Sequence, residues 1–164
     1  RRDAGPQVDA TTTSATIEYI ATTIREIRQR YPVSEVHLLG FSQGARTAYL
    51  AGIRHPELID GVLAFGGWLE TDLLPAGALE RGKGVRVVIA HGRDDQVIAY
   101  REAVQAEAIL RAAGYDLTLI PFDGAHTVGA GAVAAGWKWM RRDALPPTAA
   151  PAGTPALGSE GQAR

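Results

Sequence analysis

The sequence predicts an α/β fold in which a mostly parallel sheet is flanked by helices. Short apolar runs, several of them rich in β-branched residues, alternate with longer segments in which apolar residues recur at helical spacing. This alternation is typical of parallel sheets built from βαβ crossovers. The four apolar runs contain few polar residues, as in strands covered on both faces. With 164 residues, of which 46% are hydrophobic, the chain is long enough for one domain with its own core.

Turn-forming residues separate the predicted elements. Most of the predicted helices end at a proline or a glycine, and the first predicted strand ends directly before Gly40. In chain order we expect a loop over 1–13, a helix over 14–31, a strand over 36–39, a helix over 45–54, a strand over 62–65, a long connection with room for a helical turn over 68–84, a strand over 85–90, a helix over 100–113, a strand over 117–122 and a helix over 128–142.

Composition limits the domain organisation. Residues 1–143 are predicted to form the domain, and the Pro- and Ala-rich residues 144–164 a disordered tail, because that stretch contains too few apolar side chains to order itself. The net charge of −1 and the lack of clustered Lys and Arg argue against nucleic acid and anionic membranes as partners. The absence of cysteine excludes disulfides, a thiolate nucleophile and Cys-based metal sites.

Hydropathy predicts a cytoplasmic protein. No apolar run approaches the roughly 18–20 residues that span a bilayer. The first residues also lack the apolar stretch of a secretory signal peptide.

Gly40-Phe41-Ser42-Gln43-Gly44 has the pattern G-x-S-x-G and stands between a predicted strand and a predicted helix. In this context we expect the serine on a strained turn that lifts its Oγ above the sheet, with very small residues two before and two after it. The amino end of the following helix supplies N–H groups and a positive dipole end for a developing oxyanion. An ordinary glycine-rich turn is the alternative, and the strand–turn–helix context favours the nucleophile.

A serine nucleophile needs a histidine that takes its proton and a carboxylate that orients the histidine. Both residue types occur in the order Ser, Asp, His. Asp94 and Asp95 follow the third predicted strand, and His126 follows the fourth. Because parallel strands end at the same edge of a sheet, we expect these side chains to meet there. Either aspartate could be the acid, since each could instead be a solvated loop residue or a helix cap.

The other three histidines are interpreted as structural. His37 lies within a strand and is predicted to be a packed or edge residue, whereas His55 precedes Pro56 at a helix end, which suits a capping or dipole role. His91 is too close in sequence to the aspartates to act as the base from a separate loop. No pair of these histidines has helical i, i+4 spacing with a third ligand nearby, so no metal is expected.

Several of these motifs together resemble the phospholipase/carboxylesterase family of α/β-hydrolases, which includes acyl-protein thioesterases and small bacterial carboxylesterases. The resemblance covers roughly Ala15 to Met140. It is carried by the serine motif, by His55-Pro56-Glu57 with the strand leading to Gly66-Gly67, by Gly92-Arg93-Asp94-Asp95-Gln96-Val97 as the acid motif G-x-x-D-x-V, and by the turn Gly124-Ala125-His126.

The resemblance implies an α/β-hydrolase fold and a serine hydrolase that needs no cofactor. The expected substrates are carboxylic esters, with thioesters and lysophospholipids as further candidates. By this resemblance Ser42 attacks the carbonyl and carries the acyl group. His126 relays the proton, and Asp95, which the acid motif selects, holds the tautomer of His126. The backbone N–H of Gln43 would be one oxyanion donor. The expected partner is a small-molecule or lipid-like ester.

Two departures from the family pattern have consequences. Gly44-Ala45 stands where the family usually has two glycines, which is a small change. Family members also carry further strands ahead of the serine helix, with a His-Gly-type loop that donates the second oxyanion N–H. Nothing over residues 1–31 matches that loop. We therefore expect only the later strands of the sheet, with the N-terminal part lacking and a bare edge strand that favours a homodimer.

Three functional hypotheses remain at this point. A serine carboxylesterase is the leading one. A non-catalytic α/β-hydrolase-like binding domain or inactive fragment is the alternative from another class, and an acyltransferase on the same scaffold is the third. Four residues of the long connection are candidates either for a substrate pocket or lid or for plain packing: Trp68, Leu69, Leu73 and Leu74.

Overall fold

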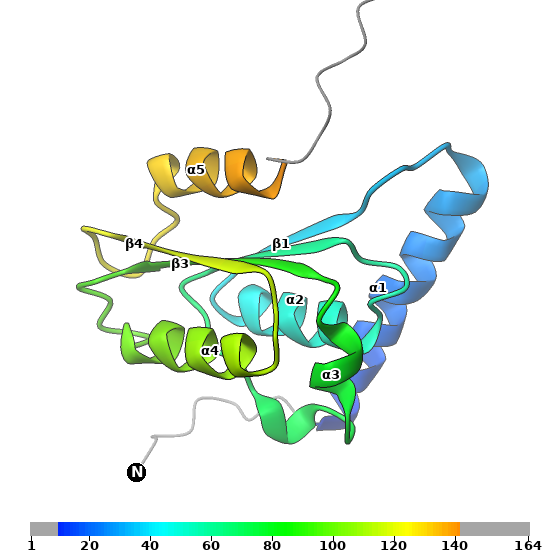
Figure 1. Cartoon of the computed structure of the whole chain (residues 1–164), viewed down its shortest axis with the longest axis horizontal. Helices are drawn as coiled ribbons and strands as arrows, with labels where there is room; N and C mark the ends of the chain where they lie inside the picture. Colours follow the sequence, from blue (N-terminus) through cyan, green and yellow to red (C-terminus); the bar gives the residue numbers. More distant parts are fainter. Residues whose placement is uncertain (1–9, 142–164) are drawn as a thin grey trace, which may run out of the picture.

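The computed structural model describes residues 10–141, so the predicted tail over 144–164 and most of the predicted N-terminal loop lie outside the described residues. The elements alternate between strand and helix, as expected (Figure 1). They are α1 (Ala10–Arg30), β1 (His37–Phe41), α2 (Gln43–Arg54), β2 (Gly61–Phe65), the 3-10 turn η1 (Thr71–Leu73), α3 (Ala78–Gly82), β3 (Arg86–Gly92), α4 (Arg101–Ala112), β4 (Leu117–Phe122) and α5 (Ala130–Met140).

The four strands form one sheet in the order β1-β2-β3-β4, and every neighbouring pair is parallel. This confirms the predicted parallel sheet. In the register, Phe41 pairs with Phe65 and Phe65 pairs with Ala90. The carboxyl ends of the strands therefore lie side by side, and the loops that follow β1, β3 and β4 leave the sheet at one edge.

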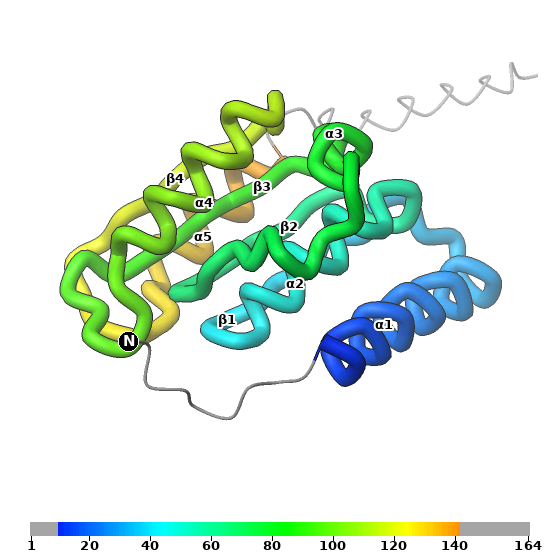
Figure 2. Tube along the Cα trace, turned by 90° about the horizontal axis from the view of Figure 1, so that it is seen from below, coloured from blue at the N-terminus to red at the C-terminus, as the bar shows by residue number. Residues whose placement is uncertain are grey.

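Helices cover the two faces of the sheet unequally (Figure 1). α2, α3 and α4 lie on one face and α5 lies on the other, while α1 runs alongside α2 (Figure 2). Side chains alternate between the faces along each strand. In β2, Val62 and Ala64 therefore join the larger core beneath α2 and α4, whereas Leu63 and Phe65 join the smaller core beneath α5.

The outer strands are less covered than the sequence suggested. β2 is buried along its whole length, and β3 is buried beyond its first residue. β1 and β4 are only partly buried, and Leu39 of β1 is 57% exposed. The expectation that all four strands are covered on both faces is therefore wrong for the outer pair. The physical reason for β1 is that α5 packs chiefly on β3 and β4.

Two local predictions need correction. α1 begins at Ala10, so residues 10–13 are helical rather than loop. Thr13 is buried and accepts hydrogen bonds from the Arg46 guanidinium, which gives this first turn a tertiary anchor. The long connection contains more structure than one helical turn, because α3 follows η1 and buries Ala78 against the larger core. No helix within 10–141 has both the length and the hydropathy that a membrane crossing requires.

Candidate active site

Ser42 occupies a sharp turn between β1 and α2. Its backbone has φ 55° and ψ −119°, and it is the one non-glycine residue with positive φ among residues 10–141. The turn is held in place because the N–H of Ser42 donates to the Phe65 carbonyl of β2 at 2.9 Å. The Ser42 carbonyl in turn accepts the N–H of Ala45 at 3.0 Å. A conformation that costs about 1–3 kcal/mol is thus maintained by the neighbouring strand and helix.

Glycines allow the close packing behind this turn. A Cβ at Gly40 would lie 2.2 Å from the Gly44 carbonyl oxygen, and one at Gly67 would lie 2.5 Å from the Ala45 Cβ. A Cβ at Gly44 meets nothing within 4 Å. The prediction that the residue two after the serine must be very small is therefore wrong on steric grounds. The tight contact falls on the other side of the turn, at Gly40 and at Gly67 in the loop after β2.

The structure brings Ser42, His126 and Asp95 together in one hydrogen-bonded chain. His126 Nε2 lies 3.0 Å from Ser42 Oγ, and His126 Nδ1 lies 2.7 Å from Asp95 Oδ2. Because a carboxylate only accepts, the Nδ1 atom carries the hydrogen and Nε2 accepts the serine hydroxyl. The ring of Phe41 packs against that of His126 with a centroid distance of 4.7 Å. Asp94, the other candidate acid, has an exposed side chain and does not take this place.

Both oxygens of Asp95 are used. Oδ1 accepts the backbone N–H groups of Val97 and Ile98, each at 2.8 Å, while Oδ2 accepts from His126. Asp95 is 5% exposed. Burial works to raise the pKa of the carboxyl, but the hydrogen bonds from His126, Ile98 and Val97, with the charge of His126, outweigh it and hold the pKa below its usual value. Asp95 is therefore ionised at neutral pH.

The acid and base loops are tied directly to each other. The N–H of Arg93 donates to the Phe122 carbonyl at 2.9 Å, and the N–H of Asp94 donates to the Gly124 carbonyl at 3.0 Å. A Cβ at Gly92 would lie 2.3 Å from the Gly124 carbonyl oxygen, so only glycine allows this approach without a shift. The turn that carries His126 is thus positioned by the backbone of the loop that carries Asp95.

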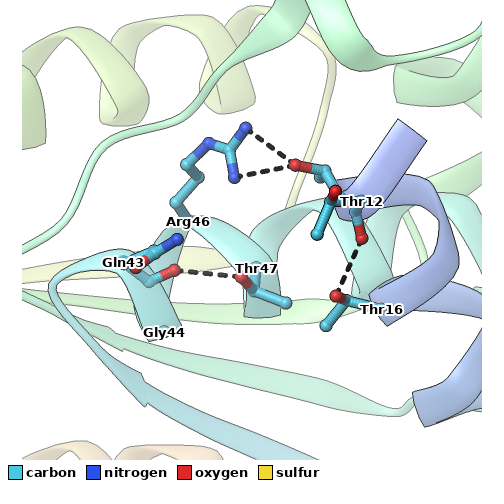
Figure 3. Close-up of a pocket in the computed structure, with 7 residues that line it drawn as sticks. Thr12, Thr16, Gln43, Gly44, Arg46 and Thr47 are labelled. Carbon is cyan, nitrogen blue, oxygen red and sulfur yellow. Dashed lines mark hydrogen bonds between the residues drawn. The ribbon is translucent and has the colours of Figure 1, made fainter. Parts of the chain in front are cut away.

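A pocket of about 480 Å³ lies between the amino ends of α1 and α2 (Figure 3). Gln43, the first residue of α2 and the one that follows the nucleophile candidate, is part of its wall. Because the first N–H groups of a helix have no acceptor within it, the Gln43 N–H is suited to bind an oxyanion. The lining consists of Thr12, Thr13, Thr16, Gln43, Gly44, Arg46 and Thr47.

Arg46, the charged residue of this lining, is paired with Glu70. Arg46 is 4% exposed, and its Nε donates to Glu70 while both terminal nitrogens donate to Thr13. The guanidinium carbon of Arg46 lies 5.9 Å from the centroid of the Trp68 ring. The other three candidates for a pocket or lid in the long connection, Leu69, Leu73 and Leu74, pack against the larger core. For these three residues the structure supports the packing interpretation.

The remaining three histidines lie within or at the ends of the predicted elements, but the contact between His91 and Asp95 was not predicted. His37 begins β1 and meets the edge of the Trp137 ring, and His55 caps the carboxyl end of α2. His91 is fully buried, and its Nε2 lies 3.3 Å from Asp95 Oδ2. A histidine at the end of an otherwise apolar strand, just before the acid loop, was the available signal. Within residues 10–141 no three His, Asp or Glu side chains are grouped as metal ligands.

The fold is shared with known structures at low sequence identity. A Bacillus cereus carboxylesterase superposes with a TM-score of 0.73 at 19% identity, over 87% of this chain and 66% of the other. Zea mays acyl-protein thioesterase 2 gives 0.67 at 18%, over 87% and 68%, and Arabidopsis thaliana SOBER1 gives 0.67 at 20%, over 82% and 65%. The chain thus spans about two thirds of the length of these proteins. A comparison with curated protein sequences gave no match.

Likeness at this level of identity shows the α/β-hydrolase fold, which confirms the predicted fold class. The family is shown by the sequence itself, because residues 1–134 match the family model described as phospholipase/carboxylesterase. That match spans all four strands and the three residues Ser42, Asp95 and His126. The chain belongs to the phospholipase/carboxylesterase family of α/β-hydrolases.

Proposed function

We propose that the chain is a serine hydrolase that cleaves carboxylic esters through an acyl-enzyme on Ser42. One observation carries this proposal. The hydroxyl of Ser42, both ring nitrogens of His126 and the buried carboxylate of Asp95 form a continuous chain with links of 3.0 and 2.7 Å. This is the geometry in which a histidine removes the serine proton while the carboxylate stabilises the imidazolium that forms. The family to which the chain belongs supports the same chemistry.

Acylation needs one proton to move twice. As Ser42 Oγ attacks the ester carbonyl carbon, its proton passes to His126 Nε2, and the carbonyl oxygen becomes an oxyanion beside the N–H of Gln43. The C–O bond to the leaving group then breaks. His126 gives the proton to that oxygen, the alcohol departs, and the acyl group stays on Ser42.

Deacylation repeats these steps with water as the nucleophile. His126 takes a proton from water, the hydroxide attacks the acyl carbon, and the proton returns to Ser42 Oγ as the acid leaves. Asp95 remains ionised throughout, in keeping with the lowered pKa of its carboxyl. A thioester would follow the same path with a thiol as the leaving group.

The pocket beside Gln43 supports a neutral substrate group. Four of its seven lining residues are threonines, and Glu70 pairs with the Arg46 guanidinium. A charged acyl or alcohol group would find no uncompensated charge in this lining to pair with. We therefore expect short neutral esters to be turned over in preference to anionic ones.

The test is hydrolysis of p-nitrophenyl acetate and butyrate by the 164-residue chain and by Ser42→Ala. Ser34→Ala, a change at an exposed serine in the loop before β1, is the matched control. We expect Ser42→Ala to lower kcat by at least about 10⁴-fold and Ser34→Ala to leave it within about twofold. A fluorophosphonate probe should label the wild-type chain at Ser42 and leave Ser42→Ala unlabelled.

A folded chain with neither Ser42-dependent turnover nor labelling would contradict the proposal and favour a non-catalytic binding domain. Assaying oxygen esters and thioesters of the same acyl group in parallel separates the two leaving groups. A higher kcat/KM for the thioester would move the assignment from esterase to thioesterase.

A further inference from the structure

His91 is a fully buried polar side chain for which the proposed reaction has no use. It is the last residue but one of β3, directly before the loop that carries Asp95. Its Nε2 lies 2.8 Å from the carbonyl oxygen of Ile98 and 3.3 Å from Asp95 Oδ2. The ring of Tyr100 meets it edge-on at 6.0 Å. His91 thus contacts the Asp95 carboxylate from within the protein interior.

The contacts of the ring assign its tautomer. A carbonyl oxygen only accepts, so the Nε2 atom of His91 must carry the hydrogen that it shares with Ile98. Its Nδ1 atom is buried and has no hydrogen-bond partner among the described residues. A hydrogen on Nδ1 would be a buried donor without an acceptor, which is unfavourable. The ring is therefore the neutral Nε2–H form.

Ile98 connects His91 to the carboxylate. The N–H of Ile98 donates to Asp95 Oδ1 at 2.8 Å, and its carbonyl accepts from His91. His91 therefore fixes the position of Ile98, whose N–H binds Asp95 Oδ1. The same Nε2 atom lies 3.3 Å from Oδ2, the oxygen that accepts from His126 at 2.7 Å.

We propose that His91 is a positioning residue that fixes the Asp95 carboxylate, through Ile98 and through Oδ2, so that Oδ2 stays aimed at His126. This inference rests on the proposed serine-hydrolase function. Its effect on the reaction passes through Asp95, and His91 itself touches no reacting atom. A ring that merely fills space would need the volume of His91 and would have no need of its Nε2–H.

A matched pair of variants separates these two cases. The side-chain amide of His91→Gln places an N–H near the position of Nε2, whereas the shorter amide of His91→Asn reaches only the position of Nδ1. We expect His91→Asn to lower kcat for p-nitrophenyl butyrate roughly 10- to 100-fold with KM little changed, as displacement of a catalytic group does. His91→Gln should recover most of this loss.

Two controls test the route of the effect. His37→Asn makes the same change at another histidine whose Nδ1 lacks a partner, at the opposite ends of the strands, and should leave kcat within about twofold. In an Asp95→Asn background, His91→Asn should have no further effect on kcat, because the carboxylate that His91 positions is already absent. Equal loss in His91→Gln and His91→Asn, or full additivity with Asp95→Asn, would overturn the inference.

Nuclear magnetic resonance tests the same inference without turnover, so its failure can be told apart from failure of the proposed function. In the wild-type chain, the ring nitrogens of His91 should report the neutral Nε2–H tautomer. The His126 Nδ1–H proton should give a low-field signal that persists in His91→Gln and weakens or shifts in His91→Asn. An Nδ1–H or doubly protonated His91 at neutral pH, or an unchanged His126 signal in His91→Asn, contradicts the inference even where ester hydrolysis is present.

Discussion

Two adjacent aspartates of the acid loop have different surroundings, and this difference decides their roles. Asp95 is buried, and its two oxygens accept three hydrogen bonds, one from the side chain of His126 and two from backbone N–H groups. The side chain of Asp94 is exposed, and that residue contributes its backbone N–H to Gly124. Residue type and order along the chain do not separate the two, because each follows the same strand. The family motif made the choice, and the hydrogen bonds give its physical basis.

Replacement of each aspartate by asparagine should therefore have very different effects on activity. An amide at position 95 donates where the carboxylate accepts, so it favours the wrong tautomer of His126. We expect Asp95→Asn to lower kcat by about 10⁴-fold. Asp94→Asn should keep kcat within about threefold, with p-nitrophenyl butyrate as the substrate for both. Comparable losses in the two variants would contradict the assignment of the acid.

Asp95 also makes stability depend on pH. Its pKa in the folded chain is lowered from 3.8, so ionisation stabilises the fold above that value, and the contribution is lost as pH falls through the lower folded pKa. The free energy of unfolding of Asp95→Asn, measured in urea, should differ from wild type by a constant amount above about pH 5. Below 3.8 the difference should shift as the wild-type carboxyl becomes protonated.

At the scale of elements, hydrophobic periodicity predicted the type and order of helices and strands better than the residues at which they begin and end. The predicted strand over 117–122 coincides with β4, and every predicted helix is present. The first turn of α1 was missed because polar threonines carry no periodic signal, and Thr13 is buried through Arg46, a residue more than 30 positions away. Such contacts between distant parts of the chain cannot be found in a local pattern. The contact between His91 and Asp95, only four residues apart, was missed for a different reason, because a strand pattern does not tell which way a loop folds back on the strand end.

The turn around Ser42 offers a sharper test of element packing. Gly40→Ala places a Cβ against the backbone of the first turn of α2, which must move, and we expect a loss of roughly 2–4 kcal/mol of unfolding free energy. Gly44→Ala adds a methyl group to open space within a helix. It should stabilise the chain by about 0.5–1 kcal/mol, the usual difference between glycine and alanine in a helix.

Urea unfolding of both variants measures these changes. A large destabilisation by Gly44→Ala would show that the motif requires a glycine there for a reason other than space. Wild-type stability in Gly40→Ala would show that the turn between β1 and α2 can relax.

At the scale of the whole molecule, the β1 side of the sheet is poorly covered within the described residues. Within residues 10–141, β1 has no strand partner on its outer edge. Leu39 shares the α5 face of the sheet with its register partner Leu63, but α5 packs chiefly over β3 and β4. Trp137 of α5 is 44% exposed nearby, where it meets His37. Unpaired backbone groups and exposed apolar side chains therefore occur together.

This uncovered edge predicts concentration-dependent self-association of the 164-residue chain through β1. Leu39→Lys, which places a charge in the middle of that strand, should weaken the association about tenfold, equivalent to about 1.4 kcal/mol. Val104→Lys is the control, because Val104 is exposed on α4, far from β1. Sedimentation velocity over a concentration series measures both. A chain that stays monomeric throughout, or variants that behave alike, would rule out β1 as the contact.

The two backbone hydrogen bonds that join the loop after β3 to the loop after β4 have a mechanical consequence. They make the histidine and its carboxylate a single rigid body, anchored on the third and fourth strands, while the serine is mounted separately between the first strand and its helix. We therefore expect thermal motion of the sheet to change the distance between His126 Nδ1 and Asp95 Oδ2 less than the distance between Ser42 Oγ and His126 Nε2. Twisting between the two halves of the sheet is the motion expected to open and close the second gap.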